Sequence, residues 1–115
     1  MLKTNSKIVR QAVRQHILDT HQIDDLVTNV DNLLTYIPNQ SRVPATADGI
    51  GQFMVDSGYF LCYYTSAREF LKEALQETDE EANKYSDEKV WQLYRHLIGR
   101  EVGWLYDNRN KVVNA

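Results

Sequence analysis

The first part of the chain places apolar residues with the period of an α-helix. Between residues 5 and 18 they recur one and four positions apart, which predicts an amphipathic helix. Asn5 or Ser6 is suited to cap this helix, because either side chain accepts hydrogen bonds from the first free N–H groups. A second stripe, spaced by three and four from Ile23 to Ile37, predicts a helix over residues 21–36. The two segments can form a helical hairpin or one bent helix.

Both prolines of the chain fall within residues 37–48 and break the helical pattern. Proline lacks an N–H donor and restricts the residue before it, so we expect a linker here. Asp48 can then cap a short helix over residues 49–57, which Gly58 would end in a left-handed conformation. Residues 59–64 are apolar or aromatic on both faces, a pattern that leaves open a short buried strand or a buried helical turn.

The helical pattern returns at a capping box formed by Ser66 and Glu69. In such a box each side chain accepts a hydrogen bond from the backbone N–H of the other residue, which places a helix start at Ala67. The predicted helix covers residues 67–83. Apolar positions disappear from residue 77 onward, so we expect its last turns to be solvated or frayed.

The last predicted helix covers residues 87–106 and starts at a cap, Ser86 or Asp87. Its apolar face is broad, which places this helix near the centre of the fold. Residues 107–115 show no period and are expected to form a loose tail. Together the elements predict a mainly α fold, a compact bundle of four or five helices in one domain over residues 1–115.

Composition agrees with such a domain and excludes several classes of protein. The chain has 115 residues, 43% apolar and 25% charged, as in ordinary globular proteins. Its longest apolar run is residues 59–64, far below the roughly 20 residues that span a bilayer. The N-terminal residues have no apolar core typical of a secretory signal, and the single cysteine cannot form an internal disulfide. We therefore expect a cytoplasmic protein without a membrane segment.

The net charge of −3 averages over segments of opposite sign. Residues 1–18 carry four basic residues and no acid, spaced by four, three and four, so that they are expected to share one helical face. These residues are Lys3, Lys7, Arg10 and Arg14. Residues 66–89 are acidic, and an acidic ridge is expected on the helix predicted over residues 67–83. The ridge consists of Glu69, Glu73, Glu77, Glu80 and Glu81.

The sequence contains no pattern typical of an active site. His16 and His21 are five positions apart, which puts them on different faces of a continuous helix, and no metal-binding histidine motif is present. Cys62 lies in an apolar run that favours a buried, unreactive thiol. Residues 49–51 are too short for a phosphate-binding loop. We therefore expect neither an enzyme nor a metal or other cofactor, and read His16 as a packed structural residue.

Aromatic residues are concentrated in the second half of the chain. They form the rim of the core or, in part, anchor a protein partner on the surface. The residues are Tyr59, Phe60, Tyr63, Tyr64, Phe70, Trp91, Tyr94, Trp104 and Tyr106.

The run GYFLCYYTSAREFLKEAL over residues 58–75 resembles a family of short proteins of unknown function carried by phages and mobile elements. The matching positions are Gly58, Leu61, Tyr63, Tyr64, Thr65, Ser66 and Phe70. The proline-containing linker and the long last helix with Trp91 and Trp104 depart from the family pattern. The resemblance implies an accessory protein of a mobile element and supplies no catalytic residues.

Two functions are expected from these observations. The first is a non-enzymatic accessory protein that binds another protein through the acidic ridge and surface aromatic residues. The alternative is a small nucleic-acid-binding regulator that uses the basic face of the first helix. The apolar stripe from Ile23 to Ile37 is long for a domain of this size, so a homodimer through that helix is a further expectation.

Overall fold

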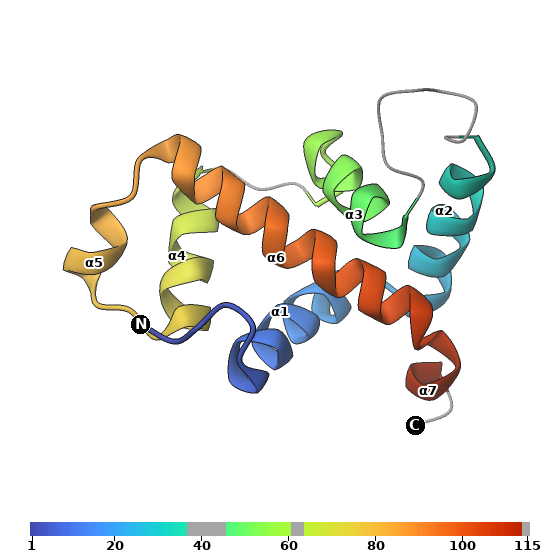
Figure 1. Ribbon diagram of the computed structural model, residues 1–115, viewed down its shortest axis with the longest axis horizontal. Helices are drawn as coiled ribbons and strands as arrows, with labels where there is room; N and C mark the ends of the chain where they lie inside the picture. The colour runs from blue at the N-terminus through green and yellow to red at the C-terminus, as the bar shows by residue number, and fades with distance from the viewer. Residues whose placement is uncertain (37–45, 61–63, 114–115) are drawn as a thin grey trace.

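One long helix, α6 (Asp87–Asp107), runs through the middle of the molecule, and most of the other helices pack against it (Figure 1). The computed structural model describes residues 1–36, 46–60 and 64–113. Within them the other helices are α1 (Lys7–Thr20), α2 (Ile23–Tyr36), α3 (Ala47–Asp56), α4 (Tyr64–Leu75), α5 (Asp79–Asn83) and α7 (Arg109–Val113). The mainly α prediction is confirmed, with seven helices and no strand in this part of the chain rather than four or five helices.

Local sequence explains where the main helices begin and which face they bury. The Ser6 side chain accepts a hydrogen bond from the backbone N–H of Val9 at 3.3 Å and caps α1, and Ser86 caps α6 in the same way. The apolar stripe of α1 is buried at Val9, Val13 and Ile17, four residues apart. The predictions for these two helices are therefore confirmed to within a few residues.

Helices α3 and α6 approach each other closely because glycines lie at their contact. A Cβ atom on Gly51 would lie 2.7 Å from both the Cα and the carbonyl oxygen of Gly99. The next turn of α6 repeats the arrangement, because a Cβ on Gly103 would clash with the Asp48 side chain. Backbone therefore packs on backbone where Gly51 meets Gly99, and the Asp48 side chain occupies the space beside Gly103.

The predicted linker and its flanking cap need correction. Residues 37–45 lie outside the described part of the chain, but Ala47 and Asp48 belong to α3 rather than to a linker. The cap is Thr46, whose hydroxyl accepts from the N–H of Gly49 at 3.1 Å, so the helix begins earlier than Asp48 predicts. Asp48 instead lies in the first turn, where a carboxylate interacts favourably with the helix dipole.

Gly58 ends the segment after α3 with φ of 87°, as predicted for a left-handed residue. The described part of residues 59–64 forms no strand, and Tyr64 already belongs to α4. Residues 61–63, where the sequence leaves the alternatives of strand and helical turn open, lie outside the described residues.

The prediction of a capping box at Ser66 is wrong, because Ser66 lies inside α4. The helix starts at Tyr64, whose ring contacts that of Trp91 at 6.0 Å between centroids, so the first turn gains a packing contact with α6. A capping box does occur later, where the hydroxyl of Thr78 and the carboxylate of Glu81 accept from each other's backbone N–H.

The single helix predicted over residues 67–83 is divided in two. Gln76 adopts a left-handed φ of 53°, and the N–H of Glu77 donates to the carbonyl of Lys72 at 2.9 Å, the hydrogen bond of a Schellman motif. Helix α4 therefore ends at Leu75 and α5 starts at Asp79. The predicted frayed turns are an ordered short helix, which packs against α4.

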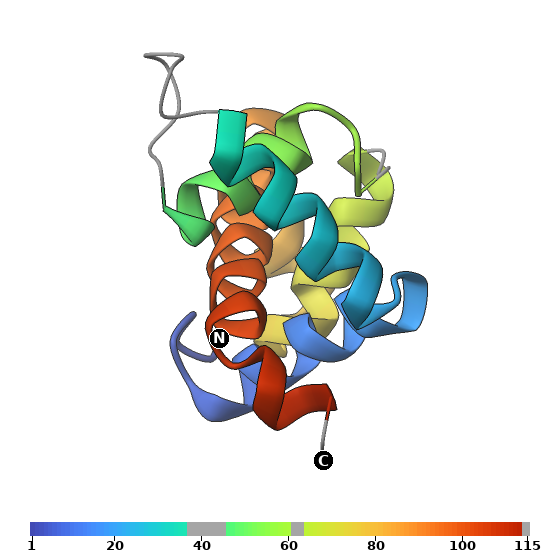
Figure 2. The same cartoon turned by 90° about the vertical axis from the view of Figure 1, so that its right-hand side faces the viewer.

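The expected loose tail over residues 107–115 contains another helix, α7. Asn108 ends α6 by donating its backbone N–H to the carbonyl of Trp104 at 2.9 Å. The Arg109 side chain then donates to the carbonyl of Tyr106 and lies over its ring, which holds the turn between α6 and α7. Figure 2 shows α2 crossing this end of the molecule, with α7 below it.

The core is one cluster of apolar side chains drawn from α1, α2, α3, α4 and α6. Its largest members include Ile17, Leu71, Tyr94 and Leu97, each almost fully buried. No helix among the described residues is both long enough and apolar enough to span a membrane.

Replacing Gly51 with alanine tests the α3–α6 contact. Helix propensity alone predicts a gain in stability of up to about 1 kcal/mol, because alanine is the better helix former. Since the new Cβ would meet backbone atoms of Gly99, we expect instead a loss of about 1–3 kcal/mol in the free energy of unfolding, measured by urea denaturation. The control Thr28→Ala, on the exposed face of α2, should change it by less than about 0.5 kcal/mol. A stabilised Gly51→Ala chain would contradict this packing.

Candidate functional site

Two of the basic residues predicted on the first helix, Arg10 and Arg14, meet α6 at a buried acid, Glu101. Its side chain is 0% exposed and accepts hydrogen bonds from the Nε atoms of Arg10 at 2.8 Å and of Arg14 at 3.4 Å. The two arginines lie one turn apart on α1, so both reach the same carboxylate. Their side chains stay 32% and 28% exposed, so each guanidinium spans from the interior to the surface. Lys7 is the first residue of α1, whereas Lys3 precedes the helix and its cap, so the prediction that all four share one helix face is wrong for Lys3.

A third arginine, Arg100, joins this cluster from α6. Its terminal nitrogen donates to the backbone carbonyl of Thr4, which ties the N-terminal segment to α6. Its Nε is buried and has no hydrogen-bond partner among the residues that the structure describes. Burial, followed by the nearby charge of Arg10, lowers the pKa of Arg100, while Glu101 and Asp48 oppose this effect. The cations of the cluster are thus crowded, with few carboxylates to neutralise them.

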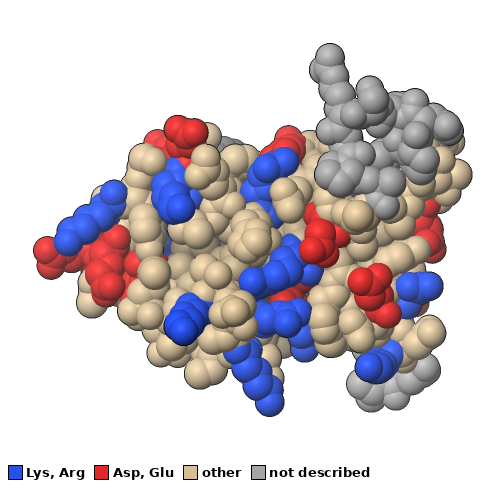
Figure 3. Space-filling model, in the orientation of Figure 1, with Lys and Arg blue, Asp and Glu red and all other residues tan. Residues whose placement is uncertain are grey.

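We call Lys3, Lys7, Arg10, Arg14 and Arg100 the basic surface. The face of the molecule in Figure 3 shows basic side chains gathered across its middle, over α1 and α6. A shallow pocket of about 240 Å³ opens on this surface, lined by Asn5, Lys7, Arg10, Gln11 and Arg14. The pocket therefore offers only positive and hydrogen-bonding side chains, which suits an anionic group.

The predicted acidic ridge is not continuous. Glu77 is only 8% exposed, and both of its carboxylate oxygens accept from the hydroxyl of Tyr85, at 2.8 and 2.9 Å. Burial, together with this hydrogen bond, raises the pKa of Tyr85 to about 12. Glu77 therefore joins α4 to the segment before α6 instead of facing solvent.

The remaining residues of the ridge form what we call the acidic surface: Glu69 and Glu73 on α4, and Glu80 and Glu81 on α5. Glu69, Glu73 and Glu80 are exposed, and Glu81 is half-buried. Lys72 pairs with Asp79 beside them, which reduces the local negative charge. The acidic surface is therefore weaker than its sequence predicts.

Helix α5 is held in place although it projects from the end of the molecule (Figure 1). The Arg68 side chain donates to the carbonyls of Ala82 and Tyr85, both at 2.7 Å, and pairs with Asp87 at 3.0 Å. Ala82 lies in α5 and Tyr85 lies two residues beyond its end, so this one side chain ties α5 to the start of α6. The acidic residues of α5 are consequently presented on an ordered support.

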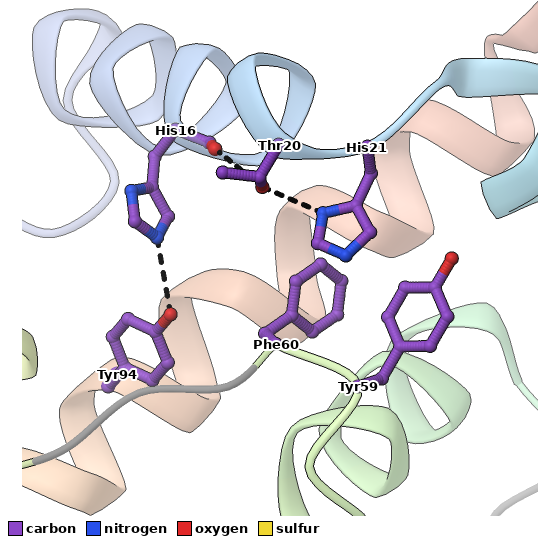
Figure 4. Close-up of a pocket in the computed structure, with 6 residues that line it drawn as sticks. All are labelled: His16, Thr20, His21, Tyr59, Phe60 and Tyr94. Atoms are coloured by element: carbon purple, nitrogen blue, oxygen red, sulfur yellow. Dashed lines mark hydrogen bonds between the residues drawn. The ribbon is translucent and has the colours of Figure 1, made fainter.

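A second pocket, of about 260 Å³, contains two of the three histidines (Figure 4). The Nε2 of His16 shares a hydrogen bond with the hydroxyl of Tyr94 at 3.2 Å. His21 stacks on Tyr59, with ring centroids 4.8 Å apart, and Phe60 also lines the pocket. The walls are therefore mostly aromatic rings.

A second hydroxyl–imidazole pair in this pocket is Thr20 with His21, at 2.7 Å. The Thr20 hydroxyl also lies within hydrogen-bond distance of the carbonyls of His16 and Ile17. If its proton is directed to these carbonyls, the hydroxyl accepts from the imidazole and is not activated by it. The pair then orients the His21 ring.

His16 is a packed residue, as its position beside the apolar stripe predicts. Its ring lies 4.3 Å from that of Phe70, centroid to centroid, and burial is the largest effect that lowers its pKa below 6.5. Cys62 lies outside the described residues. Within the described part of the chain, no three histidine, cysteine or acidic side chains are close enough together to hold a metal ion.

Most of the predicted surface aromatic residues pack on the core. Tyr59, Phe70, Trp91, Trp104 and Tyr106 lie against it, and Phe60 and Tyr94 are within it. Tyr64 is 50% exposed, and Tyr63 lies outside the described residues. An aromatic docking surface therefore has little exposed area in the part of the chain that is described.

The predicted homodimer would use the apolar stripe of α2. Leu26 and Val30 of this stripe are buried within the chain itself, and Leu33 and Leu34 are half-buried against the core. Less of the stripe is free for a second copy than its length predicts, and the homodimer stays a prediction.

We found no matching family model, curated protein or solved structure for this chain. The resemblance of residues 58–75 to phage-carried proteins therefore stays a prediction.

The sequence interpretation missed Arg100 and Glu101. A signal for Glu101 exists, because it is the single acid between the apolar positions Ile98, Val102 and Leu105 on the buried face of α6. An acid at such a position needs basic partners, and α1 carries them. The basic face could therefore have been matched to it before the fold was known.

The packing of His16 predicts a loss of stability in acid. Because its pKa is lowered in the folded state, the unfolded chain binds more protons just below pH 6.5, and the free energy of unfolding should fall as the pH decreases through this window. His16→Gln removes this titration and keeps a hydrogen-bonding group near Tyr94. Urea denaturation at pH 7.5 and 5.5 should show a smaller acid-induced loss for this variant than for the natural chain. The exposed His96, replaced by glutamine, is the matched control, and equal losses in the two variants would contradict the prediction.

Proposed function

We propose that this chain is a non-enzymatic nucleic-acid-binding protein that contacts the phosphate backbone through the basic surface. The observation that supports this most is the convergence of Arg10, Arg14 and Arg100 around a single buried carboxylate. The three arginines lie near two acids, Glu101 and Asp48, so three minus two leaves a local charge of +1 among these five side chains, on a chain whose net charge is −3. The exposed Lys3 and Lys7 add positive charge to the basic surface.

Charge segregation gives such a protein an oriented mode of binding. The acidic residues elsewhere repel the phosphate backbone, so the molecule is expected to approach a nucleic acid with the basic surface in front. Arginine suits this contact because its planar group donates two parallel hydrogen bonds to phosphate oxygens. The affinity is expected to fall steeply with salt, because each neutralised phosphate releases counterions.

Reversal of Lys3 and Lys7 tests this function. Both are exposed, so Lys3→Glu/Lys7→Glu is expected to fold normally and to lose binding to a fluorescent duplex oligonucleotide at low salt, measured by anisotropy. The slope of log affinity against log salt should fall by roughly 2, one for each lost phosphate contact.

The matched control is Lys84→Glu/Lys89→Glu, which makes the same change in net charge on two exposed lysines that do not belong to the basic surface. This control should retain most of the binding. Equal loss in both variants would attribute binding to net charge alone and reject the basic surface as the site. A natural chain that binds no oligonucleotide at low salt would reject the function itself.

Protein binding through the acidic surface is a second candidate, which the ordered support of α5 favours. The partner would be a protein with a basic face, and the role that of a cytoplasmic accessory protein of a phage or mobile element. Opposite charges on the two proteins would speed their encounter and make binding sensitive to salt.

Charge reversal of two exposed acids on α4 tests this candidate. Glu69→Lys/Glu73→Lys should abolish capture of a specific partner from a lysate of the source cell, identified by mass spectrometry. Asp24→Lys/Asp25→Lys, in the exposed first turn of α2, makes the same change in charge and should capture the partner with unchanged yield. Equal capture by all three chains would exclude the acidic surface.

A further inference from the structure

The buried Glu101 accepts hydrogen bonds from two arginines of the basic surface, in each case from the Nε atom. Arg10 and Arg14 both donate their Nε to it, and none of the described residues accepts from their terminal nitrogens. A guanidinium has four further N–H groups on those nitrogens, so each arginine keeps a complete set of donors for a ligand. Glu101 itself is 0% exposed and does not reach solvent.

A second contact fixes one of these guanidinium groups. The central carbon of the Arg14 guanidinium lies 3.7 Å from the ring centroid of Trp104, so one face of the group rests on an aromatic surface. Long side chains normally lose conformational entropy when they bind a ligand, and this cost decreases when their geometry is already fixed. The arginines are therefore set in place before any anion arrives.

We infer that Glu101 is a positioning residue, which directs the terminal nitrogens of Arg10 and Arg14 toward a phosphate group of the nucleic acid. The phosphate would lie over the pocket lined by Lys7, Arg10 and Arg14. This inference rests on the proposed function, and it adds a role for an acid inside a surface that binds anions.

Charge and positioning predict opposite effects when Glu101 is replaced. If charge alone decided affinity, Glu101→Gln would strengthen binding, because it removes a negative charge beside the phosphates. If Glu101 positions the arginines, the same variant should bind more weakly, by about tenfold for the loss of one charge-assisted hydrogen bond. The sign of the change therefore separates the two explanations.

The experiment measures the affinity of the full chain for a duplex oligonucleotide by anisotropy over a range of salt concentrations. For Glu101→Gln we expect weaker binding and a salt slope lower by up to about 2, because two arginine contacts are impaired. A partly unfolded variant would show fewer binding-competent molecules but an unchanged slope. Circular dichroism, together with a stoichiometric titration of the oligonucleotide, measures that fraction. Unchanged or tighter binding with an unchanged slope would overturn the inference.

A second variant keeps the test valid if Glu101→Gln does not fold. Arg10→Lys/Arg14→Lys retains every charge, but a lysine amine cannot hold Glu101 with one nitrogen and a phosphate with others. Positioning predicts weaker binding, whereas charge alone predicts no change. The control is Arg95→Lys, whose arginine pairs with Asp56 of α3 at 2.9 Å and should not affect binding.

The outcomes for the natural chain separate this inference from the proposed function. If the natural chain binds the oligonucleotide and both variants bind it equally well, only the role of Glu101 is rejected. If the natural chain does not bind, the function is rejected and the inference with it.

Discussion

The contact between the backbones of α3 and α6 is the constraint on which the rest of the structure depends. Gly51 lies against Gly99 so closely that a methyl group on Gly51 would meet backbone atoms, and Gly103 extends the contact by one turn. This contact fixes the rotation of α6 about its own axis. Since residues advance by about 100° in an α-helix, Glu101 lies about 200° from Gly99, on the opposite side of the helix. Helix α1 packs against that side, and its arginines meet the acid there.

The periodic parts of the fold could be predicted from the sequence, and the parts fixed by single residues could not. Helices α1, α2 and α6 each bury a regular apolar stripe, so their predicted limits are close to the observed ones. The break after α4 depends on a left-handed Gln76, where a sequence-based prediction expects glycine. The turn into α7 depends on Arg109 and Tyr106, a contact that has no local sequence pattern.

The candidate site shows the same division. Helical spacing correctly placed Arg10 and Arg14 on one face of α1, because that property is local. Arg100 and Glu101 lie about 90 residues away in sequence, so their approach to α1 depends on tertiary packing. The burial of Glu77 could also not be predicted from its helical spacing with Glu69 and Glu73. That spacing assumed a continuous helix, and the turn at Gln76 directs Glu77 toward Tyr85 instead.

The way the basic surface is built also limits what it can recognise. Helix α1 buries one face through Val9, Val13 and Ile17, which fixes its orientation relative to α6. Arg10 and Arg14 are tied to Glu101, which shortens their reach beyond the surface. Reading a base sequence requires side chains that extend to base edges in a groove, whereas contacts with phosphates require only charge and donors near the surface. The same buried acid that orients the arginines would therefore favour recognition of the nucleic-acid backbone over recognition of its sequence.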